Sequence, residues 1–398
     1  MISSVLPVYK RNDLAFERGE GCYLYTADGK RYLDFVAGIA VAAFGHANPR
    51  LIKALEAQAH KVWIVSNMFR VPGQERVADK LKKISFADTV FFTNSGVEAW
   101  ECGIKIIRRH FWSKGQKDKN RIIVCKGLFH GRTLAAISAA QTPKMCDGFG
   151  PLAEGFDQVP FNDVDALTKA VTPQHAGICF ETVQGEGGIM PATPEFLKAA
   201  RELCNKHGML LMLDEIQCGM MRTGKLWAYE HAGVTPDVMS IAKAFGGGFP
   251  VGACLATENA ASGMTIGSHG TTYGGNPLAM AVAEEALAMI TEPGLMEHVN
   301  RMSAYAFDKF AALVREFPKL VSEVRGKGLM IGLQLSEEYA DLQRLFLKHG
   351  LIAVGAGKDV LRFVPPLTVT EAQFDEALEI ARIACKEREQ EKASASAA

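Results

Sequence analysis

The chain has 398 residues, which is long enough to bury a large core and to form two or more domains. Apolar residues make up 48% and charged residues 22%, as in ordinary globular proteins, and 44 basic side chains balance 44 acidic ones. A chain with zero formal charge has no overall field that attracts nucleic acid or an anionic membrane, so neither partner is expected.

The cysteines and the hydropathy pattern predict a reducing compartment. The nine cysteines are scattered without a Cys-x-x-Cys pair, and their odd number argues against a complete set of disulfides. The N-terminus lacks the basic region and apolar stretch of a secretory signal. Because no run reaches the roughly 18 apolar residues of a membrane span, a cytoplasmic location is expected.

Residues 1–60 differ from the centre of the chain and are predicted to belong to a small domain. Residues 22–33 are typical of a β-hairpin, in which Asp28 and Gly29 supply the turn.

Residues 61–290 are predicted to form a large α/β domain. Helix-like stretches cover 97–110 and 194–207, and runs of strand length cover 89–92, 121–125, 177–180, 209–213 and 238–241. Buried strands that alternate with helices indicate a mainly parallel sheet with helices on both faces. Ligands of such sheets bind beyond the carboxyl ends of the strands.

Residues 291–386 are predicted to complete the small domain, so that both chain ends build one α+β unit. This part begins with a helix-rich segment, has strand character over 321–335 and ends with an amphipathic helix from Thr370. The last segment, 387–398, is rich in Ser and Ala and is predicted to be disordered.

Lys243 is the most informative residue of the central region. It lies between an apolar strand and the glycine-rich sequence Gly246-Gly-Gly248, and Asp214 ends another apolar strand 29 residues earlier. Pyridoxal phosphate requires a lysine for its aldehyde, an anion beside its ring nitrogen and backbone donors for its phosphate. The apolar setting of Lys243 favours a lowered pKa and a Schiff base. Pyridoxal phosphate is therefore the predicted cofactor, and no metal is expected.

Each of these residues also has an ordinary structural interpretation. Ser95 and Glu98 form a capping-box pattern at a helix start, and most lysines are simply solvated. Ser240-x-x-Lys243 matches the Ser-x-x-Lys of penicillin-binding enzymes, but the basic triplet Arg222-Thr-Gly224 precedes it instead of following it. An acyl-transfer enzyme is thus a weaker hypothesis, and a binding protein without activity has no positive support.

An ordered set of motifs over nearly the whole chain resembles the class III (ω) aminotransferases of fold-type I. The set comprises Arg18-Gly-Glu-Gly21, Gly38-Ile-Ala-Val41, Gly45-His46, Asn94-Ser-Gly96, Phe129-His-Gly-Arg-Thr133, Val183-Gln-Gly-Glu-Gly-Gly188, Asp214-Glu-Ile-Gln217, Arg222-Thr-Gly224, Lys243, His269-Gly-Thr-Thr-Tyr-Gly-Gly-Asn-Pro277 and Arg362-Phe-Val-Pro-Pro366. Each motif is weak alone, but their order is highly specific.

The resemblance implies a role for each site residue. Lys243 is expected to bind the cofactor covalently and Asp214 to pair with its ring nitrogen. The remaining cofactor contacts are implied for Gly96 and Val97 at the phosphate, Phe129 on the ring, Gln217 at the ring oxygen and Thr272 at the phosphate of a neighbouring subunit. Substrate contacts are implied for Arg132, Glu186, Thr271 and Arg362. The expected active unit is a homodimer with shared active sites.

The resemblance also implies a ping-pong transfer of the distal amino group of N2-acetylornithine to 2-oxoglutarate, as in arginine biosynthesis. Alternatives are donors such as succinylornithine, N-succinyl-diaminopimelate or 4-aminobutyrate, or an intramolecular aminomutase. Ile39 stands where ornithine aminotransferases have a tyrosine, which favours an acylated donor but also suits 4-aminobutyrate enzymes. Trp100, Met220 and Met221 stand where relatives usually have other residues, and the sequence assigns them no role.

Overall fold

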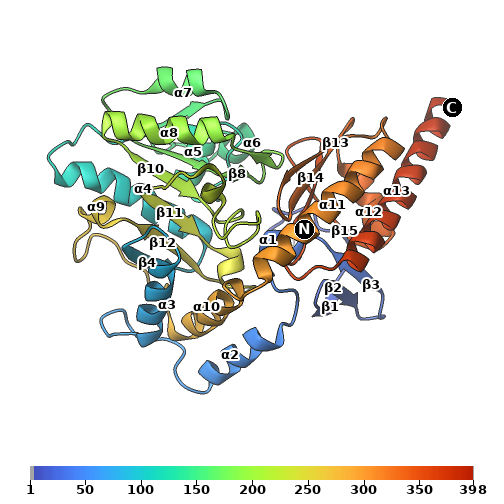
Figure 1. Ribbon diagram of the computed structural model, residues 1–398, viewed down its shortest axis with the longest axis horizontal. Helices are drawn as coiled ribbons and strands as arrows, with labels where there is room; N and C mark the ends of the chain where they lie inside the picture. Colours follow the sequence, from blue (N-terminus) through green and yellow to red (C-terminus); the bar gives the residue numbers. More distant parts are fainter. Residues whose placement is uncertain (1–3, 398) are drawn as a thin grey trace.

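A computed structural model describes residues 4–397, with side chains up to residue 395. Residues 1–3 and 398, which belong to the predicted terminal segments, lie outside this part. One group of elements surrounds a large sheet. Beside it lies a second group (Figure 1), which contains the helices α11 (Leu295–Glu316), α12 (Ala340–Lys348) and α13 (Glu371–Ala397).

The large sheet has seven strands, and it is parallel except at one strand. Its order is β4 (Thr89–Thr93), β12 (Gly252–Ala256), β11 (Val238–Ile241), β10 (Leu210–Asp214), β7 (His175–Glu181), β5 (Arg121–Cys125) and β6 (Phe156–Val159). Only β12 is antiparallel to its neighbours β11 and β4. The predicted α/β fold with a mainly parallel sheet is confirmed. Strands β6 and β12 were not predicted.

Both faces of this sheet are buried. Leu210 and Met212 of β10 belong to one core cluster, whereas Leu211 and Leu213 belong to another, because successive side chains of a strand point to opposite faces. Helices α4 (Gly96–Ser113), α5 (Leu134–Ala140) and α9 (Glu258–Ala261) supply the first cluster. The second includes residues of α3 (Pro72–Lys83), α7 (Val164–Ala170), α8 (Pro194–His207) and α10 (Pro277–Ile290).

The two chain ends share a sheet, because β15 pairs in parallel with β3. This sheet has the order β1 (Phe16–Glu20), β2 (Tyr23–Thr26), β3 (Arg31–Asp34) and β15 (Leu351–Ile352), and β2 and β3 form the predicted hairpin. A second sheet has the order β13 (Val321–Lys327), β14 (Met330–Leu335), β17 (Val360–Phe363) and β16 (Val354–Ala356). The domain boundaries at residues 60, 290 and 386 stay a prediction.

Short elements connect these parts. They are α1 (Ala37–Ala40), α2 (Pro49–Ala59), α6 (Pro143–Cys146), the strand pair β8 (Val183–Gln184) and β9 (Met190–Pro191), and the 3-10 turns η1 (Ala228–Ala232) and η2 (Lys243–Phe245).

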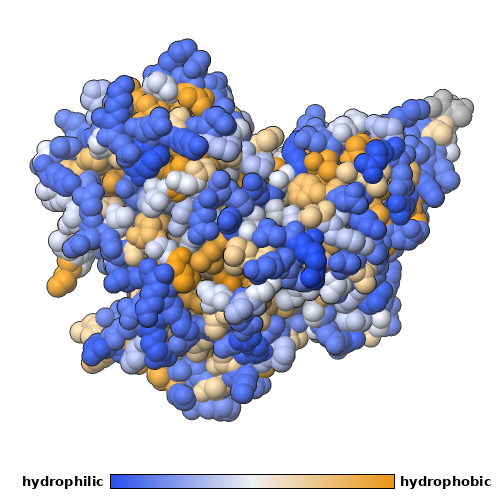
Figure 2. Space-filling view, in the orientation of Figure 1, coloured by the Kyte–Doolittle hydropathy of each residue, from blue (hydrophilic) through white to orange (hydrophobic). Residues whose placement is uncertain are grey.

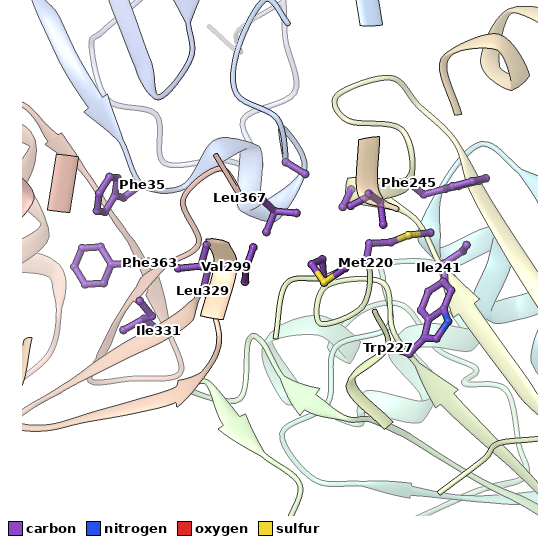
Figure 3. Packing of buried hydrophobic residues seen from close by; sticks show 14 of the residues in the cluster. Phe35, Met220, Trp227, Ile241, Phe245, Val299, Leu329, Ile331, Phe363 and Leu367 are labelled. Carbon is purple, nitrogen blue, oxygen red and sulfur yellow. The ribbon is translucent and has the colours of Figure 1, made fainter. Parts of the chain in front are cut away.

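One continuous hydrophobic cluster joins the two groups of elements, and Met220 lies in its middle. Figure 3 shows Met220 between Val299 and Leu329 on one side and Trp227 and Phe245 on the other. Met220 is 1% exposed, and its φ of 54° lies in the left-handed region. Such a backbone persists only where the surroundings hold it, and a flexible thioether fills an irregular gap well. Met220 therefore has a packing role that the sequence did not reveal.

The predicted disorder after residue 386 is wrong for residues 387–397, where α13 continues to Ala397. Arg388 makes ion pairs with Glu337 at 2.7 Å and with Asp341 at 2.7 Å, and Glu391 pairs with Arg344 at 2.8 Å. These contacts tie the helix end to α12 and the segment before it, and alanine is a strong helix former. The Ser- and Ala-rich composition suggested disorder because the sequence does not show the pairing of these charges.

The surface is mostly hydrophilic, and a notch separates the part with the large sheet from the part with α11, α12 and α13 (Figure 2). Within residues 4–397, no helix is both long and apolar enough to cross a membrane.

Candidate active site

A pocket of about 380 Å³ lies at the carboxyl edge of the large sheet, between the ends of β10 and β11 and the start of α4. This is where ligands of parallel sheets bind. Its wall contains six of the predicted site residues, namely Gly96, Val97, Phe129, Asp214, Gln217 and Lys243.

Lys243 comes after β11 and one further residue, Ala242, and it begins the turn η2. Its φ of 50° is left-handed, and a non-glycine residue pays for this conformation with strain, which is common at functional sites. Burial and the positive charge of Arg362 lower the pKa of Lys243 to about 8, although Asp214 and Glu181 oppose the shift. A lysine with this pKa is a much better nucleophile near neutral pH than a solvated one.

This lowered pKa makes a prediction about cofactor capture. Only the neutral amine attacks an aldehyde, so the rate at which the apoenzyme binds pyridoxal phosphate covalently should rise with pH and level off above about 8. Stopped-flow absorption from pH 6 to 10.5 measures this rate, and Lys243→Ala serves as the control without a covalent phase. A rate that keeps rising up to pH 10 contradicts the lowered pKa.

Asp214 is 3% exposed and is held by two hydrogen bonds. Its Oδ1 accepts from the backbone N–H of Ile216 at 2.9 Å, and its Oδ2 lies 2.6 Å from Nδ1 of the buried His130. Burial lowers the pKa of His130, but Cys179 and the hydrogen bond with Asp214 outweigh this and raise it well above its usual value. A protonated imidazole balances the charge that a buried carboxylate otherwise leaves unpaired.

The start of α4 forms the end of the pocket that suits a phosphate. Ser95 caps the helix by accepting from the N–H of Glu98, and Oε2 of Glu98 accepts from the N–H of Asn94 at 2.7 Å. The cap by Ser95 is thus present, and the return bond of Glu98 goes to Asn94, the residue before the cap. Gly96 and Val97 lie in the first turn, where N–H groups have no helical acceptor and the helix dipole attracts anions. The cap and the anion site can therefore coexist.

Phe129 and Glu181 form the next part of the wall. Oε2 of Glu181 accepts from the N–H of Phe129 at 3.0 Å, and its Oε1 accepts from Gly185 at 3.0 Å. Burial raises the pKa of Glu181 to about 7. Glu181 and His130 were not predicted as site residues. His130 stood inside the Phe129 motif and Glu181 at the end of a predicted strand, but their partners are distant in sequence.

Arg362 and Glu186 form an ion pair next to the pocket. Nη2 of Arg362 lies 2.7 Å from Oε1 of Glu186, and Nη1 donates to Oε1 of Gln217 at 3.1 Å. The Arg362 side chain is 1% exposed, whereas that of Glu186 is 38% exposed. Glu186 is therefore the partner that can move into solvent while Arg362 stays in place.

The other predicted residues lie outside the pocket wall. Arg132 is exposed, with its guanidinium carbon 5.6 Å from the centre of the Phe129 ring. Thr271 lines a different cavity of about 350 Å³, where Asn67 donates to its carbonyl oxygen at 3.1 Å. Thr272 is exposed. The chain by itself does not bring either threonine to the pocket of Lys243.

The residues at the pocket fit pyridoxal phosphate. An amine with a lowered pKa, a buried carboxylate, an aromatic ring and a helix N-terminus supply the partners for its aldehyde, ring nitrogen, ring face and phosphate. A volume of about 380 Å³ is typical of sites for small molecules.

Known proteins agree with this assignment. A model of the family "Aminotransferase class-III" matches residues 7–384. Acetylornithine aminotransferase 1 of Bradyrhizobium diazoefficiens is 52% identical over 96% of this chain and 94% of its own length, and acetylornithine aminotransferase of Rhodobacter capsulatus is 53% identical over 95% and 96%.

Solved structures also resemble the chain. Ornithine aminotransferase of Toxoplasma gondii superposes with a TM-score of 0.94 at 31% identity, over 98% of this chain and 94% of that one. N-acetylornithine aminotransferase of Stenotrophomonas maltophilia has a TM-score of 0.82 at 40% identity, over 94% and 96%. The chain belongs to the class III aminotransferases and is a pyridoxal-phosphate-dependent transaminase, as its motifs predicted.

Proposed function

We propose that this enzyme is an acetylornithine aminotransferase, which moves the distal amino group of N2-acetylornithine to 2-oxoglutarate. Relatives at 52% and 53% identity carry this name. The observation on the chain itself that carries the proposal is the buried Arg362, which a movable Glu186 neutralises beside the pocket.

Two substrates must use one pocket, and their carboxylates differ in position. The acylated donor has no carboxylate next to its reacting carbon, whereas 2-oxoglutarate has one carboxylate there and another further away. Arg132, whose guanidinium carbon lies 5.6 Å from the centre of the Phe129 ring, suits the distant carboxylate of either substrate. Arg362 suits the near carboxylate of 2-oxoglutarate, once Glu186 has moved away, because its guanidinium binds carboxylates in a bidentate way. With the acylated donor, Glu186 keeps the charge of Arg362 neutralised.

The bound cofactor supplies an electron sink that acidifies the carbon bearing the amine. Nζ of Lys243 would then take the proton from that carbon and deliver it to the cofactor carbon that carried the aldehyde, as a general base and acid with a pKa near the working pH. Asp214 keeps a negative charge at the buried end of the pocket, and Gly96 and Val97 hold the phosphate with their amides.

Arg132→Ala is expected to lower kcat/KM for both N2-acetylornithine and 2-oxoglutarate by about 100-fold, since the distant carboxylate loses its cation. Arg132→Lys should recover part of this loss, because the positive charge returns without the bidentate geometry of the guanidinium. Steady-state kinetics with each substrate measure the effect, with Arg301→Ala on the exposed face of α11 as the control. An unchanged kcat/KM removes Arg132 from the site.

A comparison of donors tests the proposed function directly. The kcat/KM values for N2-acetylornithine, succinylornithine, N-succinyl-diaminopimelate, ornithine and 4-aminobutyrate are measured with 2-oxoglutarate as acceptor. The highest value is expected for N2-acetylornithine. A preference for 4-aminobutyrate contradicts the proposal and favours a 4-aminobutyrate aminotransferase. A reaction that needs no 2-oxoglutarate also contradicts it and favours an intramolecular aminomutase.

We also propose that the active form is a cytoplasmic homodimer with shared sites. Thr272 and Tyr273 are exposed, and Asn67 links this loop to a segment with large exposed apolar side chains, Trp63 at 62%, Met68 at 89% and Phe69 at 69%. A second copy on this surface would cover the apolar side chains and bring Thr272 to the partner's phosphate site. The nine free cysteines agree with a reducing compartment.

A further inference from the structure

Trp100 packs against His130, one of the residues that line the pocket. Its indole stacks on the imidazole with a centroid distance of 5.0 Å and an interplanar angle of 16°. The Nε1–H of Trp100 donates to Sγ of Cys179 at 3.3 Å, and Phe156 stacks with the indole at 5.9 Å. Trp100 is fully buried. The orientation of its ring is thus fixed by the hydrogen bond to Cys179.

His130 needs such support because its own hydrogen bonding is incomplete. Nδ1 faces Oδ2 of Asp214 at 2.6 Å, whereas the buried Nε2 makes no well-formed hydrogen bond among residues 4–397, although Cys179 acts on the ring electrostatically. A ring held at one nitrogen can tilt about that single bond, and stacking removes this freedom. A positive imidazole also gains from contact with the face of an indole, which is the best aromatic partner for a cation.

We propose that Trp100 is a positioning residue for Asp214, which it serves by clamping the plane of His130 and so directing the Nδ1–H at Oδ2. This inference rests on the proposed pairing of Asp214 with the ring nitrogen of the cofactor. Trp100, which the sequence left without a role, becomes part of a chain from Cys179 through the indole and imidazole to the carboxylate.

The test uses variants that separate the two contacts of Trp100. Trp100→Phe keeps an aromatic face on His130 and loses the hydrogen bond to Cys179, whereas Trp100→Leu loses both. Cys179→Ala removes the acceptor and also the direct influence of Cys179 on His130. Phe156→Leu is the matched control, because it removes a ring that stacks with the same indole in the same core cluster.

The main readout is the pH titration of the visible absorption of the cofactor bound to Lys243. When Asp214 is well placed, the ring nitrogen is positive and repels the proton on the Lys243 nitrogen. Trp100→Leu should therefore move the titration midpoint up by about one pH unit, a tenfold change in the proton equilibrium. It should also weaken pyridoxal phosphate binding to the apoenzyme about tenfold. Trp100→Phe should give a smaller shift, and Phe156→Leu none.

Three outcomes decide the matter. Equal shifts in Trp100→Leu and Phe156→Leu overturn the inference, since a general packing defect then explains both. The midpoint shift caused by Trp100→Leu must also vanish in the His130→Asn background. A shift that persists in this double variant overturns the inference as well. If Trp100→Leu does not fold, Trp100→Phe must shift the midpoint, and no shift in this variant refutes the clamp. Asp214→Asn tests the underlying role separately: no shift in this variant refutes the pairing of Asp214 itself.

Discussion

Lys243→Ala is expected to abolish transamination, with kcat reduced by about 10⁴-fold or more, while the fold is retained. The variant loses the nucleophile that binds the cofactor and the base that moves the proton, and each function is individually large. The apoenzyme should unfold at the same temperature or a higher one, because burial already disfavours the ammonium form of this lysine. Activity assays and thermal unfolding of both apoenzymes measure the two effects.

Two comparisons make the Lys243 experiment specific. Lys82→Ala on the surface of α3 should keep the wild-type rate. Small primary amines added to Lys243→Ala should restore part of the activity, since they can supply the missing base. Wild-type turnover in Lys243→Ala without added amine is incompatible with the assigned chemistry.

Asp214→Asn is expected to lower kcat by about 10²- to 10⁴-fold and also to destabilise the protein by about 3 kcal/mol. The neutral amide cannot hold a positive ring nitrogen, and it leaves the buried His130 without its counter-charge at 2.6 Å. Urea unfolding of the apoenzyme and steady-state kinetics measure the two losses.

Glu215→Gln provides the matched control for Asp214. Glu215 is the adjacent buried carboxylate, but it accepts from the N–H groups of Ala228 and Tyr229 at 2.8 and 2.9 Å and does not line the pocket. We expect Glu215→Gln to change the free energy of unfolding, while the pH midpoint of the cofactor absorption stays at its wild-type value. Adding His130→Asn to Asp214→Asn should recover part of the lost stability. Equal kinetic losses in Glu215→Gln and Asp214→Asn contradict a special role for Asp214.

Much of the site was predictable because parallel strands end at one edge of a sheet. Asp214 ends β10, and Lys243 comes shortly after the neighbouring strand β11. The apolar runs before them therefore sufficed to predict that both lie at one pocket. The start of α4 joined them for the same reason, since it follows β4 directly. The antiparallel strand β12 was missed because its sequence, Gly252-Ala-Cys-Leu-Ala256, has few of the branched and aromatic residues typical of strands.

Residues that act through distant partners were not predictable from the sequence. The role of His130 depends on Asp214, 84 positions later, and that of Trp100 on a stack across two elements. The helix after residue 386 depends on ion pairs with Glu337 and Asp341. The sequence shows which side chains are present in such cases, but only the fold shows which of them meet. Thr271 and Thr272 do not line the pocket of Lys243 in the same chain. Their placement at an active site depends on the proposed dimer.

The assigned chemistry requires that Lys243 carries pyridoxal phosphate and that the donor is N2-acetylornithine. The most direct test is the visible absorption of the purified holoenzyme, recorded before and after addition of N2-acetylornithine without any oxo-acid. We expect the band of the cofactor bound to Lys243 to disappear and to return when 2-oxoglutarate is added. A band that N2-acetylornithine leaves unchanged contradicts the assigned donor, and a protein that develops no band even with added pyridoxal phosphate contradicts the assignment of Lys243.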